Sequence, residues 1–123
     1  MNLTTLLSER NKRLYALMNQ NKIFALRKIK YQETIMINIC DIELLGKEIN
    51  KGDFVIDISR NYFLEEEIDE HEAIILLKSS SVLNLVGDRI VNLALKLRLA
   101  KENSVKVIEN IPFLMVYSFV GNY

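Results

Sequence analysis

The stretch VLNLVGDRIVNLALKLRL (residues 82–99) is the most apolar part of the chain and decides how it folds. Residues 82–86 are apolar apart from Asn84 and have β-branched ends, which favours a short buried strand over a helical turn. Gly87 interrupts the run, Asp88 is able to cap the next backbone N–H groups, and the apolar residues that follow cover more than half of a helix surface. The sequence therefore predicts a buried strand, a glycine turn and a broadly buried helix that ends at Leu99.

The glycine before this helix has two interpretations. It is a turn followed by a cap, or it is part of an anion site, since free N–H groups and the positive end of the helix dipole meet there beside Arg89. Asp88 argues against an anion, because its carboxylate would occupy or repel the same place.

Length and composition limit the possible classes of protein. The 123 residues support one domain with one core, and half of them are hydrophobic. Cys40 is the only cysteine and His71 the only histidine, so we expect no disulfide within the chain, no metal site and no cofactor. No apolar run reaches the roughly 18 residues that cross a bilayer, and the N-terminus lacks the order of a signal peptide. We therefore expect a cytoplasmic protein that does not enter membranes.

Opposite charges occupy separate blocks, although the formal net charge is zero. Residues 1–30 hold seven Lys or Arg and one Glu, residues 65–72 hold six acids and no base, and residues 78–106 are again mostly basic. Such blocks are usually solvated faces, but two basic segments around an acidic one can also orient a partner. The acids at 65–72 suit the start of a helix, or a magnesium or partner site, although consecutive acids point apart.

The N-terminal segment has the pattern of an amphipathic helix over residues 3–20. Its apolar stripe consists of Leu3, Leu6, Leu7, Leu14, Leu17 and Met18. The stripe can dock on the domain's own core, contact a second copy or another partner, or lie on a membrane surface. We expect residues 1–22 to form a helical extension and residues 23–123 to form the domain.

From residue 23 onward the pattern predicts an α+β fold, with a small mixed or antiparallel sheet packed with three helices. The predicted strands are residues 23–30, 34–40, 54–58, 82–86, 105–108 and 113–120. The predicted helices are residues 42–49 with Asp41 as the cap, residues 70–79 with a capping box of Asp69 and Glu72, and residues 88–99. The last strand carries no charge, so it should lie inside the sheet or at an edge that something covers.

Four segments together resemble an archaeal family known as domain of unknown function 424, over about Ile23 to Phe119. They are ICDIELLGK (39–47), FVIDIS (54–59), the acidic approach to the helix around Ala73, and NLVGDR (84–89). The family has no established reaction or catalytic residues. The resemblance implies an association with the translation apparatus. Many members carry glutamate where this chain has Asp88, which leaves the expected cap role unchanged.

We expect a non-enzymatic archaeal protein of the translation apparatus that binds the ribosome or RNA through basic side chains. Tyr15 and Tyr31 are available for base stacking, whereas the zero net charge argues against a dedicated RNA binder. The basic residues expected to contact RNA are Arg10, Lys12, Arg13, Arg27, Lys28, Lys30, Lys96, Arg98 and Lys101.

Two other functions stay open. A small-ligand or nucleotide-binding protein, or an enzyme, would use glycines beside polar side chains. The residues of that pocket would be Asp41, Gly46, Lys47, Asn84, Gly87, Asp88 and Arg89. No nucleophile and base are brought together by the sequence, so we expect no catalytic residues. An oligomerising interaction module would use the stripe from Leu3 to Met18 or the strand at 113–120.

Overall fold

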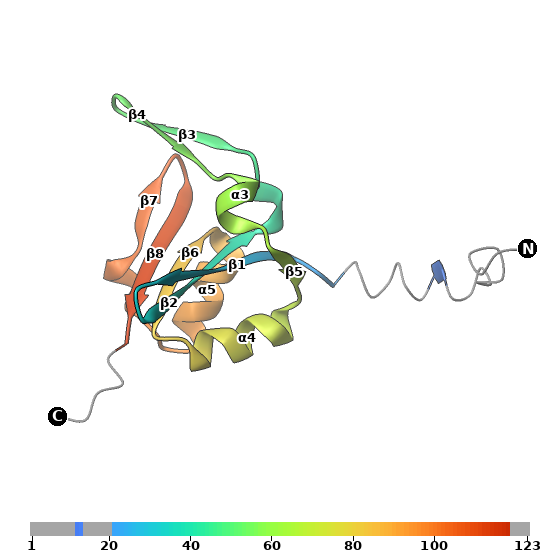
Figure 1. Cartoon of the computed structure of the whole chain (residues 1–123). Coiled ribbons are helices and arrows are strands. Elements are labelled where there is room, and N and C mark those ends of the chain that lie inside the picture. Colours follow the sequence, from blue (N-terminus) through green and yellow to red (C-terminus); the bar gives the residue numbers. More distant parts are fainter. Residues whose placement is uncertain (1–11, 14–20, 119–123) are drawn as a thin grey trace, which may run out of the picture.

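A computed structural model describes residues 12–13 and 21–118. Lys12 and Arg13 are helical and exposed, but the rest of the predicted N-terminal helix, including its apolar stripe, lies outside the described residues. Figure 1 shows the sheet and helices formed by residues 21–118. No described helix is long and apolar enough to cross a membrane.

A six-stranded sheet forms the centre of the domain, in the order β5-β1-β2-β6-β8-β7. Only β2 and β6 run parallel, and the other neighbours are antiparallel. The strands are β1 (Phe24–Tyr31), β2 (Thr34–Asp41), β5 (Glu66–Ile68), β6 (Val82–Val86), β7 (Lys106–Ile108) and β8 (Ile111–Tyr117). The predicted α+β class with a mixed sheet is confirmed.

Two helices cover one face of this sheet, which we call the closed face (Figure 1). They are α4 (Glu70–Ser79) and α5 (Asp88–Lys96). Their buried residues join one row of strand residues in the main core; that row is Leu26, Ile39, Leu85 and Leu114. Alternation along each strand sends the neighbouring residues to the other side, which we call the open face.

Part of the open face carries a second, smaller layer. This layer consists of α3 (Arg60–Phe63), the 3₁₀ turn η1 (Ile42–Leu44) and a hairpin of β3 (Glu48–Lys51) and β4 (Phe54–Asp57). It forms a second core in which Ile49, Ile58 and Phe63 pack with Cys40 and Val86 of the sheet. A further 3₁₀ turn, η2 (Glu102–Ser104), leads from α5 to β7.

Several predicted elements are confirmed. The strand at 82–86 and the helix at 70–79 have the predicted bounds, and Asp69 accepts a hydrogen bond from the Glu72 N–H at 2.8 Å, as the capping box requires. The helix after Gly87 ends earlier than Leu99, because Arg98 takes a left-handed conformation with φ 60°. There the Leu99 N–H donates to the Ala94 carbonyl and the Arg98 N–H to the Leu95 carbonyl, the pattern of a Schellman motif.

The predicted helix over residues 42–49 is wrong. Only Ile42–Leu44 is helical, and the chain then turns at Gly46, whose φ of 87° a helix does not allow. The Gly46 N–H donates to the Ile58 carbonyl at 2.7 Å, and Ile49 is buried as part of β3. The acidic run was expected only to approach a helix, but its residues 66–68 form the edge strand β5.

Candidate functional site

Asp41 closes the corner where β2 ends and α5 begins. Its side-chain oxygens accept hydrogen bonds from the backbone N–H groups of Arg89, at 2.9 Å, and Ile90, at 3.0 Å. Asp41 is 2% exposed, and the backbone at Gly87 has φ 121°. A Cβ atom on residue 87 would lie 2.4 Å from the Asp41 Cγ, so only glycine fits there. The predicted caps are therefore wrong: Asp88 is exposed and caps nothing, and Asp41 caps α5 instead of η1.

The carboxylate of Asp41 occupies the position at the start of α5 where a bound anion would accept hydrogen bonds. Burial raises the pKa of Asp41, while the N–H donors of Arg89 and Ile90 and the Arg89 charge hold that pKa down in part. Beside it, burial raises the pKa of the Cys40 thiol to about 12. Cys40 is therefore an uncharged, buried thiol at neutral pH and no nucleophile.

The seven residues of the predicted pocket do not form one site. Asp41, Gly87 and Arg89 meet at the corner, where the Arg89 guanidinium also pairs with Glu43. Gly46 and Lys47 are exposed in the turn before β3, and Asn84 lies on the open face. Arg89 does line an open hollow of about 330 Å³ with Asn92 and Lys96 of α5 and Glu70 of α4.

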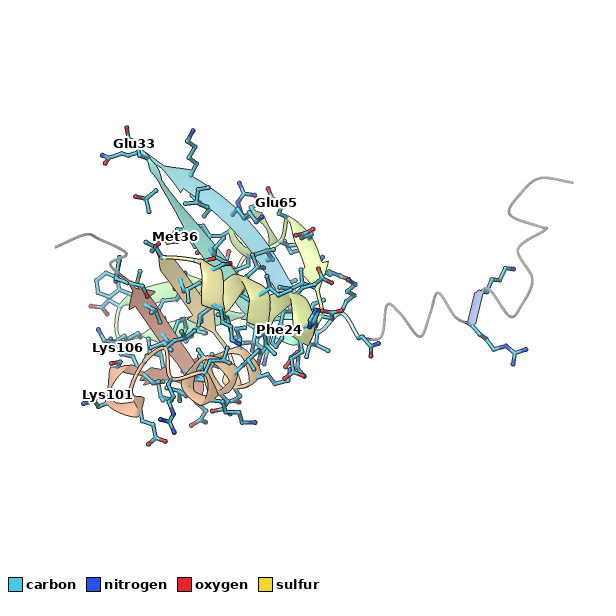
Figure 2. All side chains as sticks on the ribbon, turned by 90° about the horizontal axis from the view of Figure 1, so that it is seen from below. Phe24, Glu33, Met36, Glu65, Lys101 and Lys106 are labelled. Atoms are coloured by element: carbon cyan, nitrogen blue, oxygen red, sulfur yellow. The ribbon has the colours of Figure 1, made fainter. Side chains whose placement is uncertain are left out.

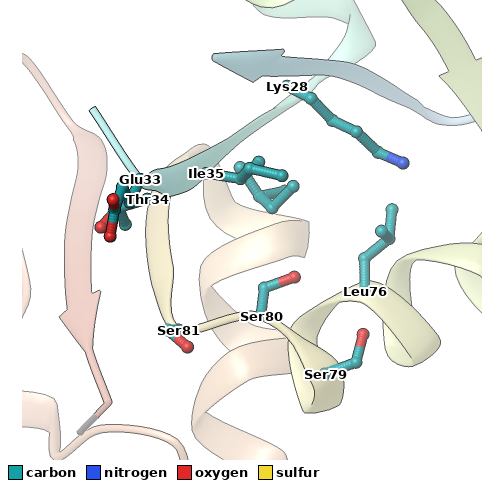
Figure 3. A pocket seen from close by; sticks show the side chains of 9 residues that line it. Lys28, Glu33, Thr34, Ile35, Leu76, Ser79, Ser80 and Ser81 are labelled. Atoms are coloured by element: carbon teal, nitrogen blue, oxygen red, sulfur yellow. The ribbon is translucent and has the colours of Figure 1, made fainter. Parts of the chain in front are cut away.

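A larger hollow, of about 480 Å³, lies between the β1–β2 turn and the end of α4. None of the seven predicted pocket residues lines it. Figure 3 shows Ile35 and Leu76 on its apolar sides, with the side chain of Lys28 at the rim near β1 and Ser79 and Ser80 at the rim near α4. The hollow is open, and the hydroxyl of Ser79 is already used by the Ile75 carbonyl at 2.7 Å.

The basic residues predicted to contact RNA fall on separate surfaces. Arg27 points to the open face, whereas Lys28 alternates to the closed face and lines the larger hollow. Lys96, Arg98 and Lys101 are exposed at the end of α5 and in the chain after it. Figure 2 places Lys101 and Lys106 at one margin of the molecule and Glu33, in the β1–β2 turn, at another. Among the residues that the structure describes, the predicted basic residues of β1 and of the α5 region therefore do not form one basic surface, and Arg10 lies outside the described residues.

A row of three polar residues and one methionine crosses four strands of the open face. Arg27, Asn38, Asn84 and Met115 occupy matching positions on β1, β2, β6 and β8. Asn38 is fully buried; its Nδ2 donates to the Tyr62 carbonyl at 3.2 Å, and its Oδ1 accepts no hydrogen bond from any described residue. Asn84, directly beside it, is only partly buried.

Exposed aromatic and apolar side chains border this row. Tyr117 on β8 is 63% exposed, Met115 is 50% exposed, and Tyr62 on α3 is 44% exposed. The partly buried Met36 and Val82 lie in the same row as Tyr117, the next row on the open face. We call the surface made by Arg27, Met36, Tyr62, Val82, Asn84, Met115 and Tyr117 the open-face surface.

Comparison with known proteins places the chain in a family. Residues 29–119 match the family model described as "Protein of unknown function (DUF424)". The chain belongs to the DUF424 family. Its fold is similar to that in the "Crystal structure of an uncharacterized conserved protein from Methanopyrus kandleri", with a TM-score of 0.67 and 15% identity over 81% of this chain and 96% of that one. No protein with a curated description matches significantly.

Two of the segments that resemble the DUF424 family lie together in the structure. ICDIELLGK supplies Asp41 and NLVGDR supplies Gly87 and Arg89, so the two segments meet at the capped corner. Sequence reasoning did not identify Asn38, Tyr62, Met115 or Tyr117 as site residues. A signal was available, because Asn38 and Asn84 each interrupt an otherwise apolar strand, and an amide inside a strand needs a partner.

Proposed function

We propose that this protein binds single-stranded RNA on its open-face surface, as a non-enzymatic protein of the translation apparatus. The observation that supports this is the accessible part of the row, Arg27, Asn84 and Met115, bordered by the exposed rings of Tyr62 and Tyr117. The family resemblance supports the association with the translation apparatus, and the arrangement of side chains on the open face supports the choice of binding surface.

The chemistry of this surface matches what unpaired bases need. Exposed tyrosine rings on a sheet stack with bases, and side-chain amides form hydrogen bonds with base edges. The side chain of Asn84 has no hydrogen-bond partner among the described residues, so its donor and acceptor are available. The guanidinium of Arg27, at the β1 end of the row, provides a contact for phosphate or for the face of a base.

The charge of this surface predicts weak, stacking-dominated binding. Arg27 is its one basic side chain, and the exposed acids Glu65 and Glu67 follow at the β5 edge of the sheet. Few phosphates are then neutralised, so the affinity should depend on salt less steeply than that of a basic RNA binder. This also agrees with the zero net charge of the chain.

Fluorescence anisotropy with labelled single-stranded RNA tests the proposal. Alanine at Tyr62 should weaken binding by roughly five- to a hundredfold, since base stacking on an aromatic side chain is worth about 1–3 kcal/mol. Phe54→Ala is the matched control, because Phe54 is 74% exposed but lies on the β3–β4 hairpin, outside the open-face surface. Circular dichroism on each variant confirms that the fold is kept.

The competing hypothesis is that RNA binds to the basic residues predicted from the sequence at the end of α5. A variant with glutamine at Lys96, Arg98 and Lys101 removes the charges near the end of α5 and leaves the open-face surface intact. If this variant loses RNA binding while Tyr62→Ala keeps it, RNA binds at α5 and the open-face assignment is wrong. If wild-type protein binds neither RNA nor ribosomal subunits at low salt, RNA binding itself is disproved.

A further inference from the structure

The two outer strands of the sheet are too short to cover their neighbours. β5 pairs only with Phe24–Leu26 of β1, and β7 pairs only with Ile111–Phe113 of β8. On its outer side, therefore, the second half of β1 has no neighbouring strand among the described residues, and neither has the second half of β8. Free strand edges expose unpaired backbone groups and favour pairing with another chain.

The free half of β1 is protected. Lys28 and Lys30 are exposed there, and the side chain of Glu65 accepts a hydrogen bond from the Lys28 backbone N–H at 3.3 Å. Charged side chains on an edge strand, lysine above all, oppose association with a second strand. This edge is therefore unsuited to pairing.

The free half of β8 has no such protection. The Ser118 N–H donates to the Ser81 carbonyl at 2.7 Å, and the Pro112 carbonyl accepts from the Gly87 N–H at 3.0 Å, so the even-numbered residues of β8 turn their backbone groups toward β6. By alternation, Met115 and Tyr117 turn theirs outward. Residues 111–118 carry no charge, and both outward-facing residues have exposed side chains.

We propose that this edge is a self-association site, at which β8 pairs antiparallel with β8 of a second copy of the chain. The two-fold axis passes beside Val116, so that Met115 lies opposite Tyr117 of the partner subunit, and Tyr117 opposite Met115 of the partner subunit. Both residues of each pair turn their N–H and C=O groups outward, so each pair exchanges two hydrogen bonds. The inference does not depend on RNA binding.

Two features favour a second copy over an unrelated strand. The free segment is complementary to itself under a two-fold axis, because Met115 and Tyr117 are equally spaced about Val116. The free segment carries no charge that would attract a charged partner strand. Contacts between Met115 and Tyr117 across the pair are favourable. β7 occupies the edge at Phe113, which limits the pairing to a few residues and makes the dimer weak and concentration-dependent.

The geometry of such a pair has a consequence for the surface. A two-fold axis between antiparallel strands is perpendicular to the sheet, so the same face of each sheet points the same way. The open-face surfaces of both copies would join into one, with the β8 strands at the centre. If the proposed function holds, the dimer presents twice the length of surface to one RNA strand.

Amide hydrogen exchange and sedimentation, both without RNA, test the proposal on the wild-type chain. From micromolar to millimolar protein the mass should rise from one chain toward two, and the amides of Met115 and Tyr117 should become protected together. The amides of Leu114 and Val116 bond within the sheet and should be protected throughout. If the mass stays that of one chain at millimolar protein, and Met115 and Tyr117 exchange rapidly at every concentration, the proposal is overturned.

Proline substitution separates the backbone effect from folding. Met115→Pro leaves the hydrogen bonds to β6 in place and removes an outward N–H together with the Met side chain. It should weaken the dimer by at least about twenty-five-fold, since each of the two lost donors alone is worth roughly a factor of five. Val107→Pro is the matched control, because residue 107 of β7 also turns its N–H away from the sheet and is 64% exposed. If both variants fold and dimerise as strongly as wild type, the β8 edge is not the contact.

Discussion

Two rows of side chains cross the same four strands one residue apart and lie on opposite faces of the sheet. The row on the closed face is Leu26, Ile39, Leu85 and Leu114, and the row on the open face is Arg27, Asn38, Asn84 and Met115. The first row is completely buried under α4 and α5, whereas the second includes a partly exposed arginine and amide and an exposed methionine. The closed face therefore carries the main core, whereas the open face carries the second core over part of its area and leaves polar and aromatic groups available for binding over the rest.

The largest expected effect is on the closed face. Leu85→Ala should lower the free energy of unfolding by about 2–5 kcal/mol, because Leu85 is fully buried in the main core and its removal leaves a cavity. Asn84→Ala, one residue away on the open face, should lower it by less than about 1 kcal/mol, as for a side chain with few packed neighbours. Chemical denaturation of both variants measures the difference. Equal losses would show that the open face is as important for folding as the closed face.

The second-largest expected effect is a loss of stability at the corner of Asp41 and Gly87, where β2 ends and α5 begins. Gly87→Ala should destabilise the fold by about 2–3 kcal/mol, because a Cβ collides with Asp41 and residue 87 has a φ of 121°. Asp41→Ala should cost a similar amount, because it removes the acceptor for two buried N–H groups of α5.

The double variant tests whether the two residues act as a unit. With Asp41 shortened to alanine the collision is relieved, so the Asp41→Ala/Gly87→Ala protein should be more stable than the sum of the single losses predicts. If the loss of stability in the double variant equals the sum of the two single losses, glycine is required at residue 87 only for its backbone conformation.

The closed face could be predicted from the sequence far better than the open face. Alternation identified β2, apolar runs identified β6 and β8, and the capping box identified α4, because those signals are local. Asp41 could not be assigned, since it caps a helix 48 residues away that only the parallel pairing of β2 and β6 brings near. The predicted helix at 42–49 was wrong for a related reason: Ile49 lies in β3 of the hairpin and is buried by tertiary contacts in the second core, not by a helical stripe.

The open-face surface could not be predicted because it depends on register. Arg27, Asn38, Asn84 and Met115 become neighbours only when four strands are aligned, and no local pattern contains that alignment. The basic residues were grouped by their closeness in sequence, but alternation along β1 sends Arg27 and Lys28 to opposite faces.

A smaller effect is expected for RNA binding at Arg27. Arg27→Gln should weaken binding by roughly five- to tenfold and lower the salt slope by about 1, as for one lost phosphate contact. Lys101→Gln is the control, because Lys101 is exposed after α5 and not on the open face. Anisotropy titrations at several salt concentrations give both numbers. An unchanged slope with weaker affinity would mean that Arg27 contacts a base and not a phosphate.

The smallest effect is a pH dependence at the buried carboxylate of the closed face. Burial raises the pKa of Asp41, so the folded state holds this proton more tightly than the unfolded chain does. The resulting stabilisation is fully present below the unfolded pKa near 3.9 and is lost as the pH rises through the raised pKa.

The side chain in the Asp41→Asn variant cannot titrate. The stability of wild type relative to Asp41→Asn should therefore fall as the pH rises from about 4 through the raised pKa of Asp41. Urea denaturation of both proteins across this range isolates Asp41, because the other titrating groups are shared. A relative stability that rises with pH would mean that the N–H donors of Arg89 and Ile90 outweigh burial and lower the pKa of Asp41.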